Sequence, residues 1–355
     1  MAAPVPETAP ASPVGSSPRE SAFHPGERAL QERAGVRARL EEVGRKVIRD
    51  FMPDQHRELF GKLPFLVVGS LDAQRQPWAS ILVGHPGFIA SPDPRTLRVD
   101  ARPGHGDALA ANIMAGAPVG LLGIELETRR RNRMNGVIVA ADELGFTVRV
   151  HQSFGNCAQY IQARAHRWVA EPSTVAAPRP LRVQDAILSA DAASLVRRAD
   201  TFFIATSSPV ATGGRSGEEV DVSHRGGKPG FVRVTEEDGH TVLTTPDFRG
   251  NFYFNTLGNI ALEPRSGLLF IDFASGDLLS LVGKSEIVWD GPELAAFAGA
   301  QGLARFRVTA GVFITDAVPL RWSQAELAPQ LAATGSWEEA GSRDRILNRS
   351  SDRSS

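Results

Sequence analysis

Cysteine, tyrosine and an excess of either charge are all scarce in this chain of 355 residues. Its single cysteine, Cys157, excludes an internal disulfide framework, a cysteine-rich zinc site and a cysteine-ligated iron–sulfur cluster. The net charge of -1 gives no overall attraction to nucleic acid or to an anionic membrane. No apolar run is long enough for a membrane span, and the start of the chain lacks the apolar core of a secretory signal. We therefore expect a reduced, cytoplasmic protein that binds neither nucleic acid nor membrane.

Histidine is also sparse and scattered. The eight histidines form no His-Glu-x-x-His run, and no carboxylate pattern typical of a metal centre accompanies them. The sequence therefore predicts no metal site.

Glycine and proline are plentiful, at 34 and 24 residues, and they punctuate short runs rich in Val, Ile, Leu, Phe and Thr. Such a composition favours turn-rich β structure. The chain is longer than one compact core of about 100–200 residues, so we expect two domains. One helix is predicted over residues 27–51, where Val36, Leu40, Val43 and Val47 recur at helical spacing.

An internal repeat divides the chain into two copies. Four anchors recur in the same order at nearly constant offsets, which indicates a tandem duplication of one domain. The anchors are Asp54 before FLVVGS and Asp191 before FFIATS, HPGF at 85–88 and KPGF at 228–231, Asn112 before GLLGIEL and Asn259 before GLLFIDF, and Gly136 and Gly283. The predicted layout is a disordered tail at 1–20, a first domain at 21–172, a linker at 173–185, a second domain at 186–325 and a polar tail at 326–355, with one short helix around Trp337 to Leu347.

Each copy reads as five or six strands with one short helix, around residues 107–115 in the first and 252–262 in the second. Many short strands at this spacing predict a barrel or a sandwich. The second copy, in SHRGGKPGFVRV, TVLTTPDFRGN, NTLGNIALEPRSGLLF and VGKSEIV, resembles the pyridoxamine 5′-phosphate oxidase-like FMN-binding split barrels. In the first copy, ETRRRNRMNG and VHQSFGNCAQYIQ are similar to segments of two-copy members of that superfamily.

The resemblance covers residues 21–325 and implies a mainly β fold of tandem split β-barrels with short helices, paired as an intrachain pseudo-dimer. It also implies one FMN between the barrels and an FMN-dependent oxidoreductase of unknown substrate. The alternatives are a non-catalytic flavin- or haem-binding carrier or sensor, and a deazaflavin-dependent reductase. Expected partners are a small-molecule substrate, NAD(P)H or a separate reductase as electron donor, and a second two-copy chain in a homodimer.

The residues themselves indicate a phosphate site in the second copy. Arg249, Gly250 and Asn251 follow a predicted strand and precede the short helix, where arginine forks and backbone N–H groups bind phosphate. Arg225 ends the neighbouring strand and would supply a second fork. The alternative is that both arginines are solvated turn residues.

The first copy offers a second source of positive charge. Strand alternation over residues 128–136 places Arg129, Arg131 and Arg133 on one face. This face would line a cavity between the copies and contact flavin, phosphate or an anionic substrate. The alternative is an edge strand whose arginines pair with nearby glutamates.

We also expect Gln152 and Ser153 to reach the flavin of the second copy from the start of a helix running from Ala158 to Trp168. Capping of that helix by Ser153 is the alternative. Cys157 is either an inert thiol or a redox or ligand group. The first copy has Arg102 but lacks the Arg-Gly-Asn sequence, which predicts one flavin site rather than two. The candidate FMN-binding residues are Ser223, His224, Arg225, Gly230, Phe231, Val232, Thr244, Thr245, Arg249, Gly250, Asn251, Arg131, Arg133, Gln152 and Ser153.

Overall fold

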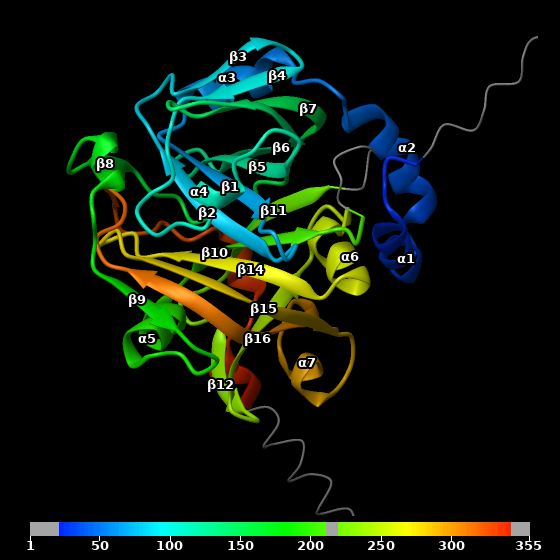
Figure 1. Cartoon of the computed structure of the whole chain (residues 1–355). Helices are drawn as coiled ribbons and strands as arrows, with labels where there is room; N and C mark the ends of the chain where they lie inside the picture. The colour runs from blue at the N-terminus through cyan, green and yellow to red at the C-terminus, as the bar shows by residue number, and fades with distance from the viewer. Residues whose placement is uncertain (1–20, 211–218, 342–355) are drawn as a thin grey trace, which may run out of the picture.

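The computed structural model describes residues 21–210 and 219–341, and it is built on two open antiparallel sheets (Figure 1). The first sheet has the strand order β2-β1-β5-β6-β7-β4-β3, and the second has the order β11-β10-β14-β15-β16-β13-β12 with β9 beside β16. The first-sheet strands are β1 (Phe65–Leu71), β2 (Pro77–Val83), β3 (Ile89–Asp93), β4 (Thr96–Val99), β5 (Pro118–Glu125), β6 (Arg130–Ala141) and β7 (Phe146–Gly155). The second-sheet strands are β9 (Leu181–Gln184), β10 (Thr201–Ser207), β11 (Val220–Gly226), β12 (Arg233–Glu237), β13 (His240–Phe248), β14 (Arg265–Ile271), β15 (Leu278–Val288) and β16 (Ala300–Ile314).

The two sheets have the same order when each is numbered from its own first strand, namely 2-1-5-6-7-4-3. The repeat in the sequence and the repeat in strand order therefore coincide. The predicted mainly β fold is confirmed, and neither of the two large antiparallel sheets closes on itself. Each repeat has seven strands rather than five or six, and its short helix, α4 (Leu109–Asn112) or α6 (Asn255–Leu262), follows the fourth strand.

Strand β16 is the seventh strand of the second repeat, beyond the five or six that the sequence predicts. Strand β16 carries arginines where an alternating apolar pattern would be needed to reveal it. Arg305 donates to the carboxylate of Glu286 on the neighbouring strand β15 and to that of Glu237 at the end of β12, one strand further across the sheet. Arg307 donates to the backbone carbonyl of Glu237 at 3.1 Å. Cross-strand ion pairs therefore replace apolar contacts along part of this strand.

Each copy has an apolar core of its own, and a further apolar core is shared between the copies. One lies within the first sheet and includes Phe60, Leu82 and Phe146, and another lies within the second sheet and includes Phe202 and Phe270. The third is shared, because it joins side chains of β1, β2 and β5 to side chains of β10, β11 and β14. The copies thus bury a common core, as the predicted pseudo-dimer requires. In Figure 1, β1 and β2 lie beside β10, β11 and β14.

Equivalent glycines allow this close contact. A Cβ on Gly120 of β5 would lie 2.4 Å from the carbonyl oxygen of Val220 in the second copy. A Cβ on Gly267 of β14 would lie 2.3 Å from the carbonyl oxygen of Pro77 in the first copy. Both glycines belong to the repeated GLL anchor, so the anchor marks where each copy touches the other.

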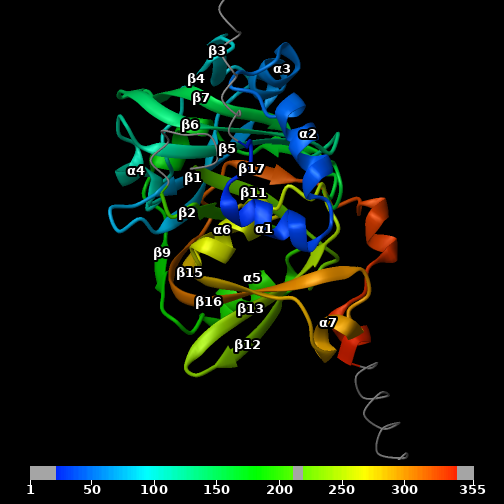
Figure 2. The same ribbon diagram turned by 90° about the vertical axis from the view of Figure 1, so that its right-hand side faces the viewer.

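The predicted helix at 27–51 is two helices, α1 (Pro25–Arg33) and α2 (Arg37–Val47). Gly35 breaks the helical path with a φ of 68° between them, a conformation that glycine adopts without steric cost. Helix α1 lies beside α6 of the second copy (Figure 2). The other helices are α3 (Asp54–Lys62), α5 (Ala190–Arg198) and α7 (Pro292–Ala296), with short 3₁₀ turns η1 (Pro172–Ala176) and η2 (Pro329–Ala333).

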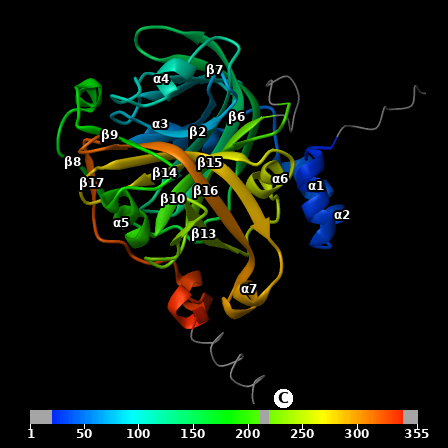
Figure 3. The same ribbon diagram turned by 60° about the horizontal axis from the view of Figure 1, so that its bottom comes forward.

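Both segments flanking the second repeat are structured. The predicted linker contains η1 and strand β9, which pairs with β16 (Figure 3). Just before the predicted polar tail, strand β17 (Leu320–Trp322) pairs with β8 (His166–Trp168) of the first copy. The tail itself packs on the second copy, where Trp337 donates its Nε1–H to the carbonyl of Phe231 at 2.8 Å. Residues 337–341 are helical. The predicted tail at 1–20 and residues 342–355 lie outside the described residues.

Among residues 21–210 and 219–341, no helix has the length and apolar character needed to cross a membrane.

Candidate functional site

A polar cavity of about 110 Å³ lies between the two copies. The first copy contributes part of strand β6 and the segment that follows β7. The second copy contributes the ends of β11 and β13, the loop after β13 and the first turn of α6. Its lining includes Arg131, Arg133, Asn156, Cys157, Gln159, Tyr160, Ser223, His224, Arg225, Phe231, Asp247, Phe248, Gly250, Asn251, Phe252, Phe254, Asn255 and Thr256.

Arg131 and Arg133 share one face of β6 and both cross to the second copy, as the alternation predicts. Arg133 is 1% exposed, and its guanidinium donates to Asp221 at 2.8 Å and to the hydroxyl of Ser223. Arg133 is therefore occupied by an ion pair that joins the copies. Arg129 does not join this row, because it lies in the turn before β6 and donates to the carbonyl of Ile161 at 3.0 Å.

Arg131 has a different set of contacts. Its Nε donates to the carbonyl of Cys157 at 2.7 Å, and its Nη1 lies 3.0 Å from Nδ1 of His224. Burial, followed by repulsion from Arg131 and Arg225, holds the pKa of His224 well below its usual range. His224 is therefore a neutral acceptor, and within the described part of the chain no carboxylate forms an ion pair with Arg131.

Arg225 faces the one acidic residue of the cavity lining. Its Nη2 lies 3.8 Å from Oδ1 of Asp247. Burial raises the pKa of Asp247, and Arg225 partly opposes that rise. Burial lowers the pKa of Arg131 to about 9, and Arg225 adds to the effect. The cavity lining thus carries Arg131 and Arg225 but a single carboxylate, which lies within ion-pair distance of Arg225 alone. The surplus positive charge favours an anionic ligand.

The first turn of α6 borders the same cavity. Residues Asn255, Thr256 and Leu257 line it, and the N-cap residue Phe254 makes no side-chain capping hydrogen bond. The preceding turn is held by Asn251, whose Oδ1 accepts the N–H of Tyr253 at 3.1 Å. An uncapped helix start beside two arginines is suited to binding a phosphate group.

Aromatic rings form the remaining wall. Tyr160 stacks on Phe248, with ring centroids 5.1 Å apart, and its hydroxyl donates to the carbonyl of Arg249 at 3.2 Å. Tyr160, Phe252 and Phe254 have φ values of 62°, 61° and 62°. This left-handed conformation is strained for a bulky residue and is concentrated at functional sites.

Gln152 and Ser153 do not lie at a helix start as predicted. Both lie inside β7, which continues to Gly155, and no helix runs from Ala158 to Trp168. The hydroxyl of Ser153 lies 2.8 Å from Nδ1 of His56, and neither residue lines the cavity. The segment after β7 does reach the second copy, but with Asn156, Cys157, Gln159 and Tyr160.

The structure brings eight of the fifteen predicted residues to the cavity, and the other seven lie elsewhere. Val232 and Thr245 line a small apolar cavity inside the second sheet, and Thr244 is fully buried. Gly230 lies in the turn before β12, and the exposed Arg249 places its guanidinium 5.2 Å from the ring of Phe252. The eight lining residues are Arg131, Arg133, Ser223, His224, Arg225, Phe231, Gly250 and Asn251.

Sequence reasoning missed Asp247, Tyr160 and the aromatic loop residues Phe248, Phe252 and Phe254. Asp247 lies two residues before Arg249 in the segment PDFRGN. Its closeness to the predicted site could therefore have been inferred from the sequence. The left-handed aromatic residues carry no such signal, because bulky side chains are not associated with that conformation.

The equivalent position in the first copy is apolar. Counting from the repeated anchors, Ile81 stands where His224 does and Leu278 where Arg131 does. These two side chains line a cavity of about 20 Å³ together with Val175 and Ile314, and its lining also includes Arg102, His105 and Asp107. Leu181 of β9 packs against Gly106 at its edge, so the linker helps to fill this position.

No protein-family model and no curated protein matches this chain. Among solved structures, HupZ of Group A Streptococcus is 13% identical with a TM-score of 0.28, over 37% of this chain and 97% of its own. A FAD-binding protein of Mesorhizobium loti is 12% identical with a TM-score of 0.24, over 38% of this chain and 98% of its own. A Clostridium acetobutylicum protein related to general stress protein 26, of the pyridoxinephosphate oxidase family, is 13% identical with a TM-score of 0.21, over 35% of this chain and 81% of its own.

Proposed function

We propose that the chain binds FMN in the cavity between its copies and uses it as an oxidoreductase. The observation that carries this proposal is a cavity lining that holds Arg131 without a carboxylate partner among the described residues and Arg225 opposite the single carboxylate of Asp247, at the uncapped start of α6. The unpaired Nε2 of the buried His224, which also lines the cavity, fits a polar ligand. FMN combines a phosphate group, which suits the positive charge of Arg131 and Arg225, with a planar ring system, which suits the aromatic side chains of the cavity wall.

In this proposal the residues of the chain bind and orient the cofactor. Arg225, Arg131 and the N–H groups of Thr256 and Leu257 would hold the phosphate, and Tyr160 would cover the ring from the first copy. The flavin would supply hydride or electron transfer. Asp247 is the one carboxyl positioned to hold or release a proton there.

The test is the cofactor of the purified protein. We expect absorbance bands at about 370 and 450 nm, and FMN by mass spectrometry of the released ligand. FAD alone, a haem Soret band or a deazaflavin spectrum would contradict the proposal. Reduction of the bound flavin by NAD(P)H, or by an added flavin reductase, then tests the oxidoreductase assignment against a carrier that binds without turnover.

A further inference from the structure

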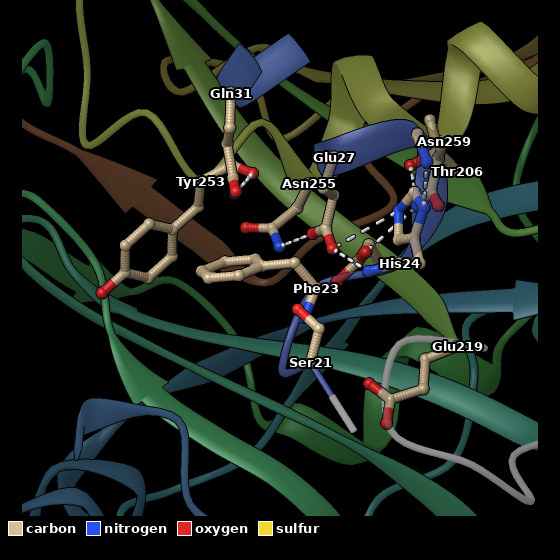
Figure 4. Close-up of polar contacts among 12 residues, drawn as sticks. Ser21, Phe23, His24, Glu27, Gln31, Thr206, Glu219, Tyr253, Asn255 and Asn259 are labelled. Atoms are coloured by element: carbon tan, nitrogen blue, oxygen red, sulfur yellow. Dashed lines mark hydrogen bonds and ion pairs between the residues drawn. The ribbon is translucent and has the colours of Figure 1, made fainter. Parts of the chain in front are cut away.

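Helix α1 places a carboxyl group directly behind the α6 end of the cavity (Figure 4). Glu27 is 3% exposed, and one of its oxygens accepts the backbone N–H of His24 at 2.8 Å. Its other oxygen accepts a hydrogen bond from Nδ2 of Asn255. Asn255 is the first residue of α6 and lines the cavity. One amide side chain therefore separates a buried carboxyl from the candidate anion site.

The backbones of α1 and α6 fix this carboxyl in place. A Cβ on Gly26 would lie 2.1 Å from the carbonyl oxygen of Gly258, and a Cβ on Gly258 would lie 2.6 Å from the backbone nitrogen of Glu27. The two helices thus touch along their main chains. Glu27 cannot turn to solvent unless α1 separates from α6.

The groups facing Glu27 give its charge little compensation. Burial lowers the pKa of His24 to about 4, so this neighbour is neutral at pH 7. Asp221 faces it with a second negative charge, and Arg133 is engaged by Asp221 at 2.8 Å. The positive charge of Arg28, the residue after Glu27 on α1, also lowers the pKa of His24. Burial, reinforced by Asp221, holds the pKa of Glu27 well above its usual range.

We propose that Glu27 and Asn255 form a proton-dependent switch for anion binding, an inference that rests on the proposed function. When Glu27 is ionised, both its oxygens accept, and Nδ2 of Asn255 is held toward α1. When Glu27 is protonated, its hydroxyl donates to Oδ1 of Asn255, so the amide turns over and Nδ2 can donate to an anion in the cavity. Binding of the anion is then accompanied by transfer of one proton from solvent to Glu27.

The test compares affinities for FMN and for sulfate at about pH 7 and about pH 8.5, since one linked proton weakens binding by up to about tenfold per pH unit. Sulfate keeps its charge throughout this range. Glu27→Gln removes the titration, while its amide can still donate to Oδ1 of Asn255. Glu32→Gln, on the exposed side of the same helix, is the matched control. We expect about a tenfold loss of affinity at the higher pH in the wild type and in Glu32→Gln, and less than about twofold in Glu27→Gln.

Equal pH dependence in the wild type and Glu27→Gln overturns the switch and would point to Arg131, which also lies in the site. Affinities that do not change with pH in the wild type overturn it too. If sulfate shows the Glu27-dependent loss but FMN does not bind, the switch stands and the FMN proposal fails; if neither ligand binds, both fail. Should Glu27→Gln not fold, calorimetry of the wild type in two buffers of different ionisation enthalpy decides, with uptake near one proton supporting the switch and none overturning it.

Discussion

At the scale of single residues, Arg131 and Arg133 lie on one face of β6 but have different contacts. Arg133 is neutralised by Asp221 and sealed between the copies, whereas Arg131 lacks a carboxylate partner among the described residues and lines the cavity. Alternation along β6 could predict that both side chains point the same way. It could not predict which of them finds an acid, because Asp221 is far away in sequence and reaches Arg133 only through the pairing of the copies.

Arg225→Gln tests the anion site directly. We expect FMN binding to weaken by about 1.5–3 kcal/mol, because a charge-assisted contact to phosphate is lost. Arg102→Gln is the matched control, since Arg102 is an exposed arginine that donates to the backbone carbonyl of Glu143 beside the first-copy cavity. Quenching of flavin fluorescence measures both affinities. Equal losses in the two variants would contradict an asymmetric site.

Arg133→Met tests the structural arginine. Because it leaves Asp221 charged and buried, we expect a loss of about 3–5 kcal/mol in the free energy of unfolding. Arg130→Met, three positions earlier on the same strand and exposed, is expected to change that free energy by less than about 1 kcal/mol. Urea unfolding followed by circular dichroism gives both values. A fully stable Arg133→Met protein that has lost only FMN affinity would instead place Arg133 in the ligand site.

At the scale of elements, the repeated GLL anchor predicts a paired weakness. Gly120→Ala and Gly267→Ala should each cost about 1–3 kcal/mol of unfolding free energy, because each new Cβ meets a backbone oxygen of the other copy. Gly61→Ala in helix α3, where the nearest atom would be 3.9 Å away, is the control and should be neutral or stabilising. Denaturant midpoints compare the three. Tolerance of alanine at both anchor glycines would argue against the close contact between the copies.

Element boundaries decided which site residues the sequence could reveal. The run after residue 146 was expected to end as a strand before Gln152, but cross-strand pairing with β6 carries β7 to Gly155. Because β7 is longer than expected, Gln152 and Ser153 lie inside the sheet. The segment that reaches the second copy is instead the one after β7, at residues 156–160. The strand–turn–helix around Arg249 to Asn251 was predicted correctly, because β13 ends at Phe248 and α6 begins at Asn255.

Long-range packing accounts for what the pattern could not show. The linker carries little apolar pattern, yet β9 pairs with β16 because an edge was open there. The contact of α1 with α6 depends on two glycines separated by most of the chain, Gly26 and Gly258. Neither contact has a local sequence signature, so both emerge only from the folded chain.

At the scale of the whole molecule, the pseudo-symmetry of the fold provides two equivalent cavities, and the side chains leave one of them suited to an anion. One cavity has Arg131, His224 and Arg225 at its wall. Its counterpart has Ile81 and Leu278 at the corresponding places and is narrowed by residues of the linker. The second copy thus supplies the loop after β13 and the start of α6, and the first copy supplies Arg131 and Arg133 of β6.

This asymmetry predicts one FMN per chain. The first-copy cavity of about 20 Å³ has one arginine in its lining, Arg102, which donates to the backbone carbonyl of Glu143, and it also has the carboxylate of Asp107. A phosphate dianion there would lose its water without gaining the surplus of positive charge that the other cavity offers, which is unfavourable. Titration of cofactor-free protein, followed by absorbance and checked against protein concentration by amino-acid analysis, should therefore saturate at one equivalent per chain. The double variant Leu278→Arg and Ile81→His would reproduce Arg131 and His224 in the second cavity. Val175 and Leu181 still occupy space there, so we expect FMN to remain excluded from that cavity. Two equivalents in the wild type would mean that the linker leaves the second cavity when ligand is present, and the packing of β9 beside β16 would then be one of two states of the chain.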